Sequence, residues 1–137
     1  MQPDARPPSG PRGRIGASAE EAAACWLSAA GWIILARNVR VGRDELDLLA
    51  RDPQGAMVVV EVRARSSPAF GSGVESVDVH KVARLYRAAA TLRRVGHEAV
   101  GPGPLPAPLR IDLVALRRDQ GGAWRMEAHL HGLEPPG

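Results

Sequence analysis

Acidic side chains inside apolar, strand-like segments are the feature of this 137-residue sequence that most needs a chemical explanation. Asp47 lies within the segment Glu45–Arg51, and Glu61 lies within the apolar segment Ala56–Arg63. A carboxylate in the middle of a strand is costly to desolvate unless it is paired or binds a metal ion. The turn-forming sequence at residues 52–55 joins the two segments, so their strands are expected to be neighbours.

Two neighbouring carboxylates repel each other unless a cation lies between them. Carboxylate oxygens favour a hard ion, so the pair Asp47 and Glu61 predicts a site for Mg²⁺ or Mn²⁺. The other interpretation is that Glu61 pairs with Arg63 or another arginine and that Asp47 lies at a strand end. Alternation along a strand places Glu45 and Asp47 on one face, with Leu46 and Leu48 on the other. Spacing alone does not choose between the two interpretations.

The elements that position these residues follow from the hydrophobic pattern. Ser18 begins a helix with the spacing of a capping box, and Gly31 ends it. The other expected elements are strands Trp32–Arg37, Glu45–Arg51 and Ala56–Arg63, helix Val79–Val95, and strands Arg110–Arg117 and Ala123–Leu130. The order α-β-β-β-α-β-β predicts an α/β fold with a mixed central sheet flanked by helices. We expect one domain over residues 15–131, a disordered tail at 1–14 and a fraying tail at 132–137.

Composition sets the class of protein. The net charge of +3 permits a polyanionic partner without requiring one. No apolar run approaches the roughly 18–20 residues of a membrane span, so no membrane partner is expected. The single Cys25 fits a reducing compartment, and we expect a cytoplasmic location. Lys81 is the one lysine among the 18 basic residues, which makes its position worth explaining.

Ordered sequence blocks resemble the YraN-type UPF0102 family. The family patterns are G-x-x-G-E-x-x-A, G-y-x-i-l-x-x-N, G-E-I-D-L-I-A, F-V-E-V-K-x-R, V-d-x-x-K and R-F-D-v-v. The matching blocks are Gly16–Ala23, Gly31–Asn38, Asp44–Ala50, Val59–Arg65, Val77–Lys81 and Arg110–Val114. The family is similar to archaeal Holliday-junction resolvases and carries the restriction-endonuclease-like PD-(D/E)xK core. In that core two acidic residues bind Mg²⁺, and a lysine positions or activates the attacking water.

The resemblance implies a role for each matching residue. Asp47 and Glu61 would be catalytic metal ligands. Glu20 would be an acidic residue of the first helix that binds the metal through water, and a solvated first-turn glutamate is an equal alternative. Glu45 would support the ligands or form an ion pair. Arg63 stands at the lysine position; because arginine keeps its charge, it can stabilise negative charge but cannot act as a general base.

Residues around the core could contact nucleic acid. Arg65, with Ser66 and Ser67 in the loop Ser66–Gly73, could line a groove for the phosphate backbone, and a plain mobile loop is the alternative. Lys81 could face the site and contact the scissile phosphate, or it could be an ordinary exposed lysine. His129 and His131 lie close together near the C-terminus, and we do not expect a metal site there.

The residues and the resemblance together predict a Mg²⁺- or Mn²⁺-dependent endonuclease that acts on DNA, including branched structures. The alternative is a DNA- or RNA-binding module of the same fold with weak or absent catalysis, which Arg63 favours. A structural or protein-interaction domain is a third interpretation, resting on the modest basic charge alone. A homodimer is expected from the resemblance to resolvases.

Overall fold

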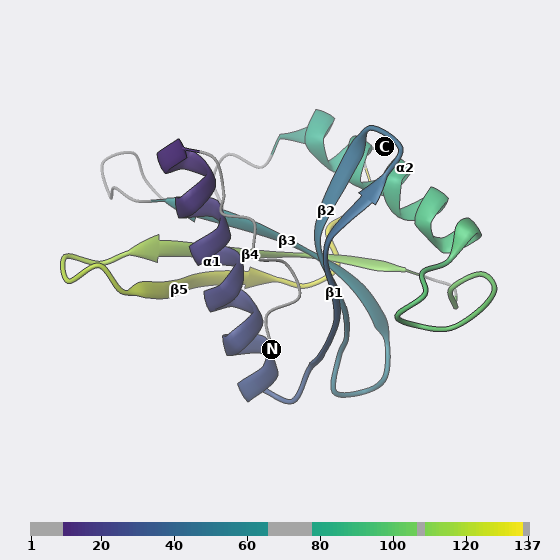
Figure 1. The fold of residues 1–137 in the computed structure, drawn as a ribbon, viewed down its shortest axis with the longest axis horizontal. Coiled ribbons are helices and arrows are strands. Elements are labelled where there is room, and N and C mark those ends of the chain that lie inside the picture. The colour runs from purple at the N-terminus through teal and green to yellow at the C-terminus, as the bar shows by residue number, and fades with distance from the viewer. Residues whose placement is uncertain (1–9, 66–77, 107–108, 136–137) are drawn as a thin grey trace.

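The computed structural model describes residues 10–65, 78–106 and 109–135, which form a sheet with helices on both sides (Figure 1). The elements in chain order are α1 (Gly10–Ala29), β1 (Ile33–Val41), β2 (Asp44–Arg51), β3 (Met57–Arg65), α2 (Val79–Val95), β4 (Arg110–Arg118) and β5 (Trp124–Leu130). The predicted order α-β-β-β-α-β-β and the α/β class are confirmed. Within the described residues, no helix is long and apolar enough to cross a membrane.

The sheet is mixed, as the sequence pattern predicts. Its five strands lie in the order β1-β2-β3-β4-β5. Strands β3 and β4 are parallel and are joined by the crossover that contains α2, whereas the other neighbouring pairs are antiparallel. The long apolar run in β3 therefore occupies the centre of the sheet, where both of its faces are covered.

Each helix covers one face of the sheet with its own apolar cluster. On the α1 side, Leu27 packs with Leu48, Val60 and Val114 in a cluster of buried residues. On the α2 side, the buried cluster includes Leu49, Val59, Leu85, Leu92 and Ile111. Successive valines of β3 thus contribute to opposite faces, which fixes the direction of every side chain along that strand.

Helix α1 begins earlier than the capping-box pattern predicts. It starts at Gly10 rather than near Ser18, so residues 10–14, expected in the disordered tail, are helical. Pro11 is compatible with this start, because the N–H groups of the first helical turn have no acceptor within the helix, so the N–H that proline lacks is not missed as a hydrogen-bond donor. Ser18 lies within the helix, and its Oγ accepts a hydrogen bond from Trp124 Nε1 at 2.8 Å. Residues 1–9 of the predicted tail lie outside the described residues.

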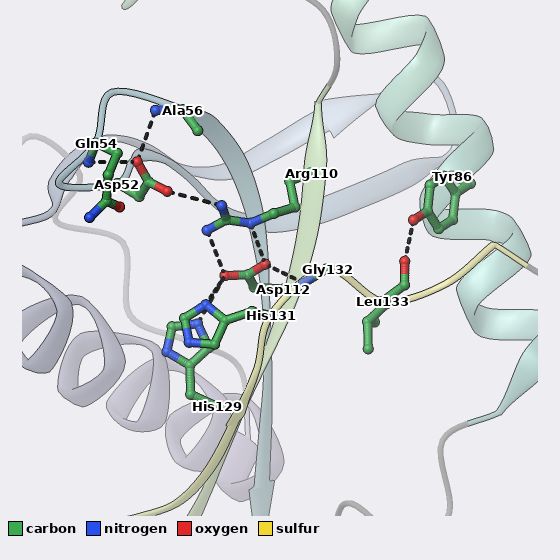
Figure 2. Close-up of polar contacts among 10 residues, drawn as sticks. All are labelled: Asp52, Gln54, Ala56, Tyr86, Arg110, Asp112, His129, His131, Gly132 and Leu133. Carbon is green, nitrogen blue, oxygen red and sulfur yellow. Dashed lines mark hydrogen bonds and ion pairs between the residues drawn. The ribbon is translucent and has the colours of Figure 1, made fainter.

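The chain after β5 is held more firmly than a fraying tail would be. Gly132 N donates to Asp112 Oδ1 at 2.8 Å, and Leu133 N donates to the Ile111 carbonyl at 2.7 Å. The Tyr86 hydroxyl of α2 donates to the Leu133 carbonyl (Figure 2). Gly132 has a positive φ of 66°, which lets the backbone turn back toward β4 at this point.

Candidate functional site

Strands β2 and β3 stop pairing just before the two acidic residues. Their last paired residues toward this end are Leu48 and Val60. Beyond them, Asp47 Oδ2 accepts a hydrogen bond from the backbone N–H of Val62 at 2.8 Å. The Asp47 side chain thus takes the place of a backbone acceptor, which anchors its carboxylate beside Glu61.

The backbone of β2 bends at Asp47, which corrects one prediction. Leu46 belongs to the α2-side cluster and Leu48 to the α1-side cluster, so these leucines do not share a face as simple alternation predicts. Asn38 of β1 lies opposite Asp47, between the pairs Arg37–Leu48 and Val39–Leu46, and has a positive φ of 52°. Asparagine tolerates this conformation. We attribute the change of face to this local departure from extended backbone.

Glu61 is the more buried of the two acids, with only 8% of its side chain exposed. Its Oε2 lies 2.9 Å from Lys81 Nζ of α2. Its Oε1 is buried and has no hydrogen-bond partner within the part of the chain that the structure describes. Burial and the nearby Asp47 carboxylate raise the pKa of Glu61 to about 7, although Lys81 opposes this shift.

Helix α1 brings a third carboxylate to the same place. Glu20 is half-buried, and burial together with the carboxylates of Asp47, Glu45 and Glu61 raises its pKa to about 8. Because α1 starts at Gly10, Glu20 is not in the first turn, and the alternative of a solvated first-turn glutamate does not apply. Glu45 is exposed at the edge of this acidic group.

Two cavities are lined by both members of the Glu61–Lys81 ion pair. A cavity of about 140 Å³ is lined by Arg63, Glu61 and Lys81 together with Asp78 and apolar residues. A second cavity, of about 100 Å³, is lined by Glu45, Glu61, Lys81 and Arg84 among others. Lys81 therefore faces Glu61 rather than being an ordinary exposed lysine, and one arginine lines each of the two cavities.

The remaining predicted binding residues lie at the end of β3. Arg65 is the last residue of β3, is half-buried and pairs in register with Arg117. Ser66, Ser67 and the rest of the loop Ser66–Gly73 lie outside the described residues.

The acidic group has the chemistry of a site for a hard divalent cation. Asp47, Glu61 and Glu20 offer carboxylate oxygens only, which suits Mg²⁺ or Mn²⁺ better than softer metals. A buried carboxylate oxygen without a donor is unfavourable, and a bound cation would satisfy it. A bound cation would also offset the repulsion between these neighbouring carboxylates.

Sequence reasoning gave too little weight to a second set of polar residues, around Asp112. Asp112 of β4 is fully buried and contacts Arg110, His129 and Gly132. The signal that singled out Asp47 and Glu61, an acid inside an apolar strand, is equally present in Ile111–Leu116. Its histidine partners come from another strand and could not be assigned to it from spacing.

Comparison with known proteins identifies relatives over most of the chain. The model of the uncharacterised protein family UPF0102 matches residues 19–116. A UPF0102 protein of Beutenbergia cavernae is 44% identical over 119 residues, covering 87% of this chain and 94% of the relative. A UPF0102 protein of Bordetella parapertussis is 42% identical over 130 residues, covering 91% of this chain and 72% of the relative.

Among solved structures, the chain is similar to a repair endonuclease from Pyrococcus abyssi. The TM-score is 0.42 at 22% sequence identity, and the match covers 77% of this chain and 40% of that chain. Similarity at this level does not carry an activity from one protein to the other.

Proposed function

This chain belongs to the UPF0102 family, and we propose that it is a nucleic-acid-binding protein with metal-dependent endonuclease activity toward DNA. One observation carries the proposal: Asp47 of β2 interacts electrostatically with Glu20 of α1 and with Glu61 of β3, and Glu61 has a buried oxygen without a donor among the described groups. A lysine and an arginine line an open cavity together with Glu61. Carboxylates that bind a cation next to cationic side chains suit the hydrolysis of a phosphodiester.

Asp47, Glu61 and Glu20 would hold Mg²⁺ or Mn²⁺, with Glu45 as a supporting acid. The bound ion would supply Lewis-acid polarisation of a phosphate oxygen and a lowered pKa for water. Asp47 is already oriented by the N–H of Val62, so its second oxygen is available as a ligand. Glu20, whose pKa is raised to about 8, must lose its proton to act as a ligand near neutral pH.

Arg63 and Lys81 would act on the phosphate. The guanidinium of Arg63 stays protonated, so it would stabilise developing negative charge and could not serve as the base. Lys81 Nζ lies 2.9 Å from Glu61, within reach of any phosphate oxygen brought to that carboxylate. We assign Lys81 a contact with the scissile phosphate, whereas the family's lysine that positions or activates the attacking water is replaced here by Arg63.

The DNA backbone would run along α2 and past the end of β3. Arg84, Arg87 and Arg94 are exposed on α2, and Arg84 lines the second cavity. Arg65, Ser66 and Ser67 would contact phosphates at the other side of the site, because guanidinium, hydroxyl and backbone N–H groups all suit phosphate oxygens. A preference for branched DNA and a homodimeric state remain expectations from the resemblance to resolvases.

The test is cleavage of linear, flapped and four-way-junction DNA with Mg²⁺ or Mn²⁺. The wild-type chain would be compared with Asp47→Asn and Glu61→Gln, which keep size and shape while removing charge. Glu98→Gln, an exposed acid in the α2–β4 connection, is the matched control. We expect metal-dependent cleavage by wild type and control, and at least a 100-fold loss in both site variants.

Arg63 favours a second candidate function, a nuclease-like module that binds nucleic acid with little or no cleavage. An arginine at the family's lysine position cannot exchange a proton at neutral pH. Salt-sensitive DNA binding without cleavage by the wild-type chain would select this function. Absence of both binding and cleavage would reject both functions and favour a structural or protein-interaction role.

A further inference from the structure

A second cluster of polar side chains, remote in sequence from Asp47 and Glu61, lies where the start of β4 meets the end of β5. Asp112 Oδ2 lies 2.9 Å from His129 Nε2 and 3.4 Å from His131 Nδ1. The two imidazole rings are stacked, with centroids 3.8 Å apart and planes 18° from parallel. Figure 2 shows both rings on the same side of the Asp112 carboxylate, facing its Oδ2.

The fold holds these side chains in place from several directions. Asp112 Oδ1 accepts hydrogen bonds from Arg110 Nε at 2.9 Å and from Gly132 N at 2.8 Å. The Gly132 contact requires the backbone turn after β5, and His131 is the residue just before that glycine. His129 is packed against Trp26 and Trp32, at ring-centroid distances of 5.7 and 5.5 Å.

The Asp112 carboxylate has four hydrogen-bond partners, and His131 is a further neighbour. A carboxylate offers about two lone-pair positions on each oxygen. Arg110 Nη2 and His129 Nε2 occupy the two positions at Oδ2. His131 Nδ1 faces the same oxygen from 3.4 Å without a hydrogen bond to it, so a cation between them would give this nitrogen a partner.

The net charge around the cluster favours the binding of a cation. Arg110 bridges two buried carboxylates, Asp52 at 2.9 Å and Asp112 at 2.9 Å. The two carboxylates and the guanidinium together carry one net negative charge. Buried negative charge is costly unless a cation compensates it.

We propose that Asp112, His129 and His131 form a zinc site, with a water molecule as the fourth ligand. Two imidazoles and a carboxylate are a ligand set that Zn²⁺ favours over Mg²⁺. Tetrahedral zinc with bonds of about 2.0–2.1 Å requires ligand atoms about 3.3 Å apart. The three ligand atoms lie within 4.8 Å of one another, and the exposed His131 ring must turn out of its stack on His129 to direct its nitrogen at the same ion. The 61% exposed side chain of His131 leaves the fourth position open to solvent.

Arg110 acts as a positioning residue for this site. Its Nε and Nη2 hold both oxygens of Asp112, and its Nη1 is held in turn by Asp52. A carboxylate ligand fixed by hydrogen bonds of this kind keeps its orientation when the metal binds. The site shares no residue with the proposed Mg²⁺ site, so the two proposals stand or fall separately.

The test measures Zn²⁺ binding by the untagged, full-length chain after treatment with a chelator. His131→Ala is the informative variant, because His131 is exposed and its removal should spare the core. His80→Ala, an exposed histidine of α2, is the matched control. An Asp47→Asn/Glu61→Gln double variant removes the other proposed site. A cooperative urea transition for each variant in chelator would establish that each is folded.

We expect one equivalent of Zn²⁺ bound by wild type, by His80→Ala and by the double variant, and affinity at least tenfold weaker in His131→Ala. Bound Co²⁺ should show the intense visible bands of four-coordinate cobalt and quench the fluorescence of Trp26 and Trp32, and His131→Ala should lose both signals. No Zn²⁺ binding by wild type, or equal affinity in His131→Ala, would overturn the proposal. Loss of Zn²⁺ binding in the double variant would overturn it as well.

Discussion

At the scale of single residues, the burial of Glu61 makes its ion pair with Lys81 important for the site. Its carboxylate is nearly buried, and Lys81 is the cation that compensates it. Removing one member of such a pair leaves a buried charge that neither water nor protein satisfies. Lys81 is 45% exposed, so it can also reach a ligand in the cavities on either side.

Lys81→Ala should therefore impair cleavage much more than DNA binding. We expect a loss of about 100-fold in the single-turnover cleavage rate, because one stabilising cation is removed from the reacting phosphate. DNA affinity, measured by fluorescence anisotropy, should change little, since most of the phosphate contacts remain. Arg51→Ala, which removes a cation at the β2–β3 hairpin away from α2, is the control. Unchanged cleavage by Lys81→Ala would refute the assigned phosphate contact.

The acidic group should make the metal-free protein less stable as pH rises. The pKa of Glu20 is raised from its usual 4.5 to about 8, so the folded state holds a proton that the unfolded state releases. The free energy of unfolding should then fall as pH rises from about 4.5 toward 8. Urea denaturation in chelator at several pH values measures this slope.

Glu20→Gln supplies the control for this pH dependence, because glutamine cannot ionise. The variant should lose less stability than wild type between pH 4.5 and 8, with the remaining slope due largely to Glu61. Added Mg²⁺ should stabilise wild type more at the upper end of this range than at the lower end. An identical slope in both proteins would show that Glu20 does not titrate in this range.

At the scale of elements, β4 is held at its start by a buried ionic network. Arg110 lies between Asp52, which follows β2, and Asp112 in β4 itself (Figure 2). Asp52 also accepts hydrogen bonds from the backbone of Gln54 and Ala56 in the β2–β3 turn. One arginine thus connects the turn, the central parallel strands and, through Asp112, the end of β5.

Arg110→Ala should be strongly destabilising, because it leaves two buried carboxylates without their cation. We expect a loss of about 3 kcal/mol in the free energy of unfolding, at the low end for a buried pair since Arg110 is partly exposed. Arg125→Ala, which removes the exposed pair with Asp119, should cost far less, because water screens an exposed ion pair. Equal urea midpoints for the two variants would contradict the importance assigned to the network.

At the scale of the whole molecule, the distribution of charge should govern how nucleic acid binds. The net charge of +3 is modest, and the acidic group lies close to basic side chains of α2. A nucleic-acid partner would therefore be attracted to the arginines of α2, while a divalent cation would screen the repulsion between phosphates and carboxylates.

DNA affinity should fall steeply with salt. Each neutralised phosphate adds about 0.9 to the negative slope of log K against log salt for duplex DNA. The double variant Arg84→Ala/Arg87→Ala should lower the slope by about two and weaken binding across sequences alike. Arg51→Ala, at the β2–β3 hairpin and away from both α2 and the end of β3, should leave the slope unchanged. A slope that is the same in all three proteins would place the DNA on another surface.

The sequence alone determined the features that depend on local periodicity. Helix α2 was predicted with its observed bounds, and the strands were predicted to within a few residues, because hydrophobic spacing reports which faces are buried. The proximity of Asp47 and Glu61 also followed from the sequence, since a short turn joins their strands. Their use as metal ligands stays a prediction.

Only the tertiary structure decided which distant side chains meet. Glu20 reaches Asp47 from α1, Lys81 reaches Glu61 from α2, and the Asp112 of β4 faces histidines at the end of β5. The bend of β2 likewise depends on Asn38 of the neighbouring strand. These contacts arise from the order of the strands and the placement of the helices, which are set by the packing of the whole chain. Spacing along the sequence therefore does not predict them.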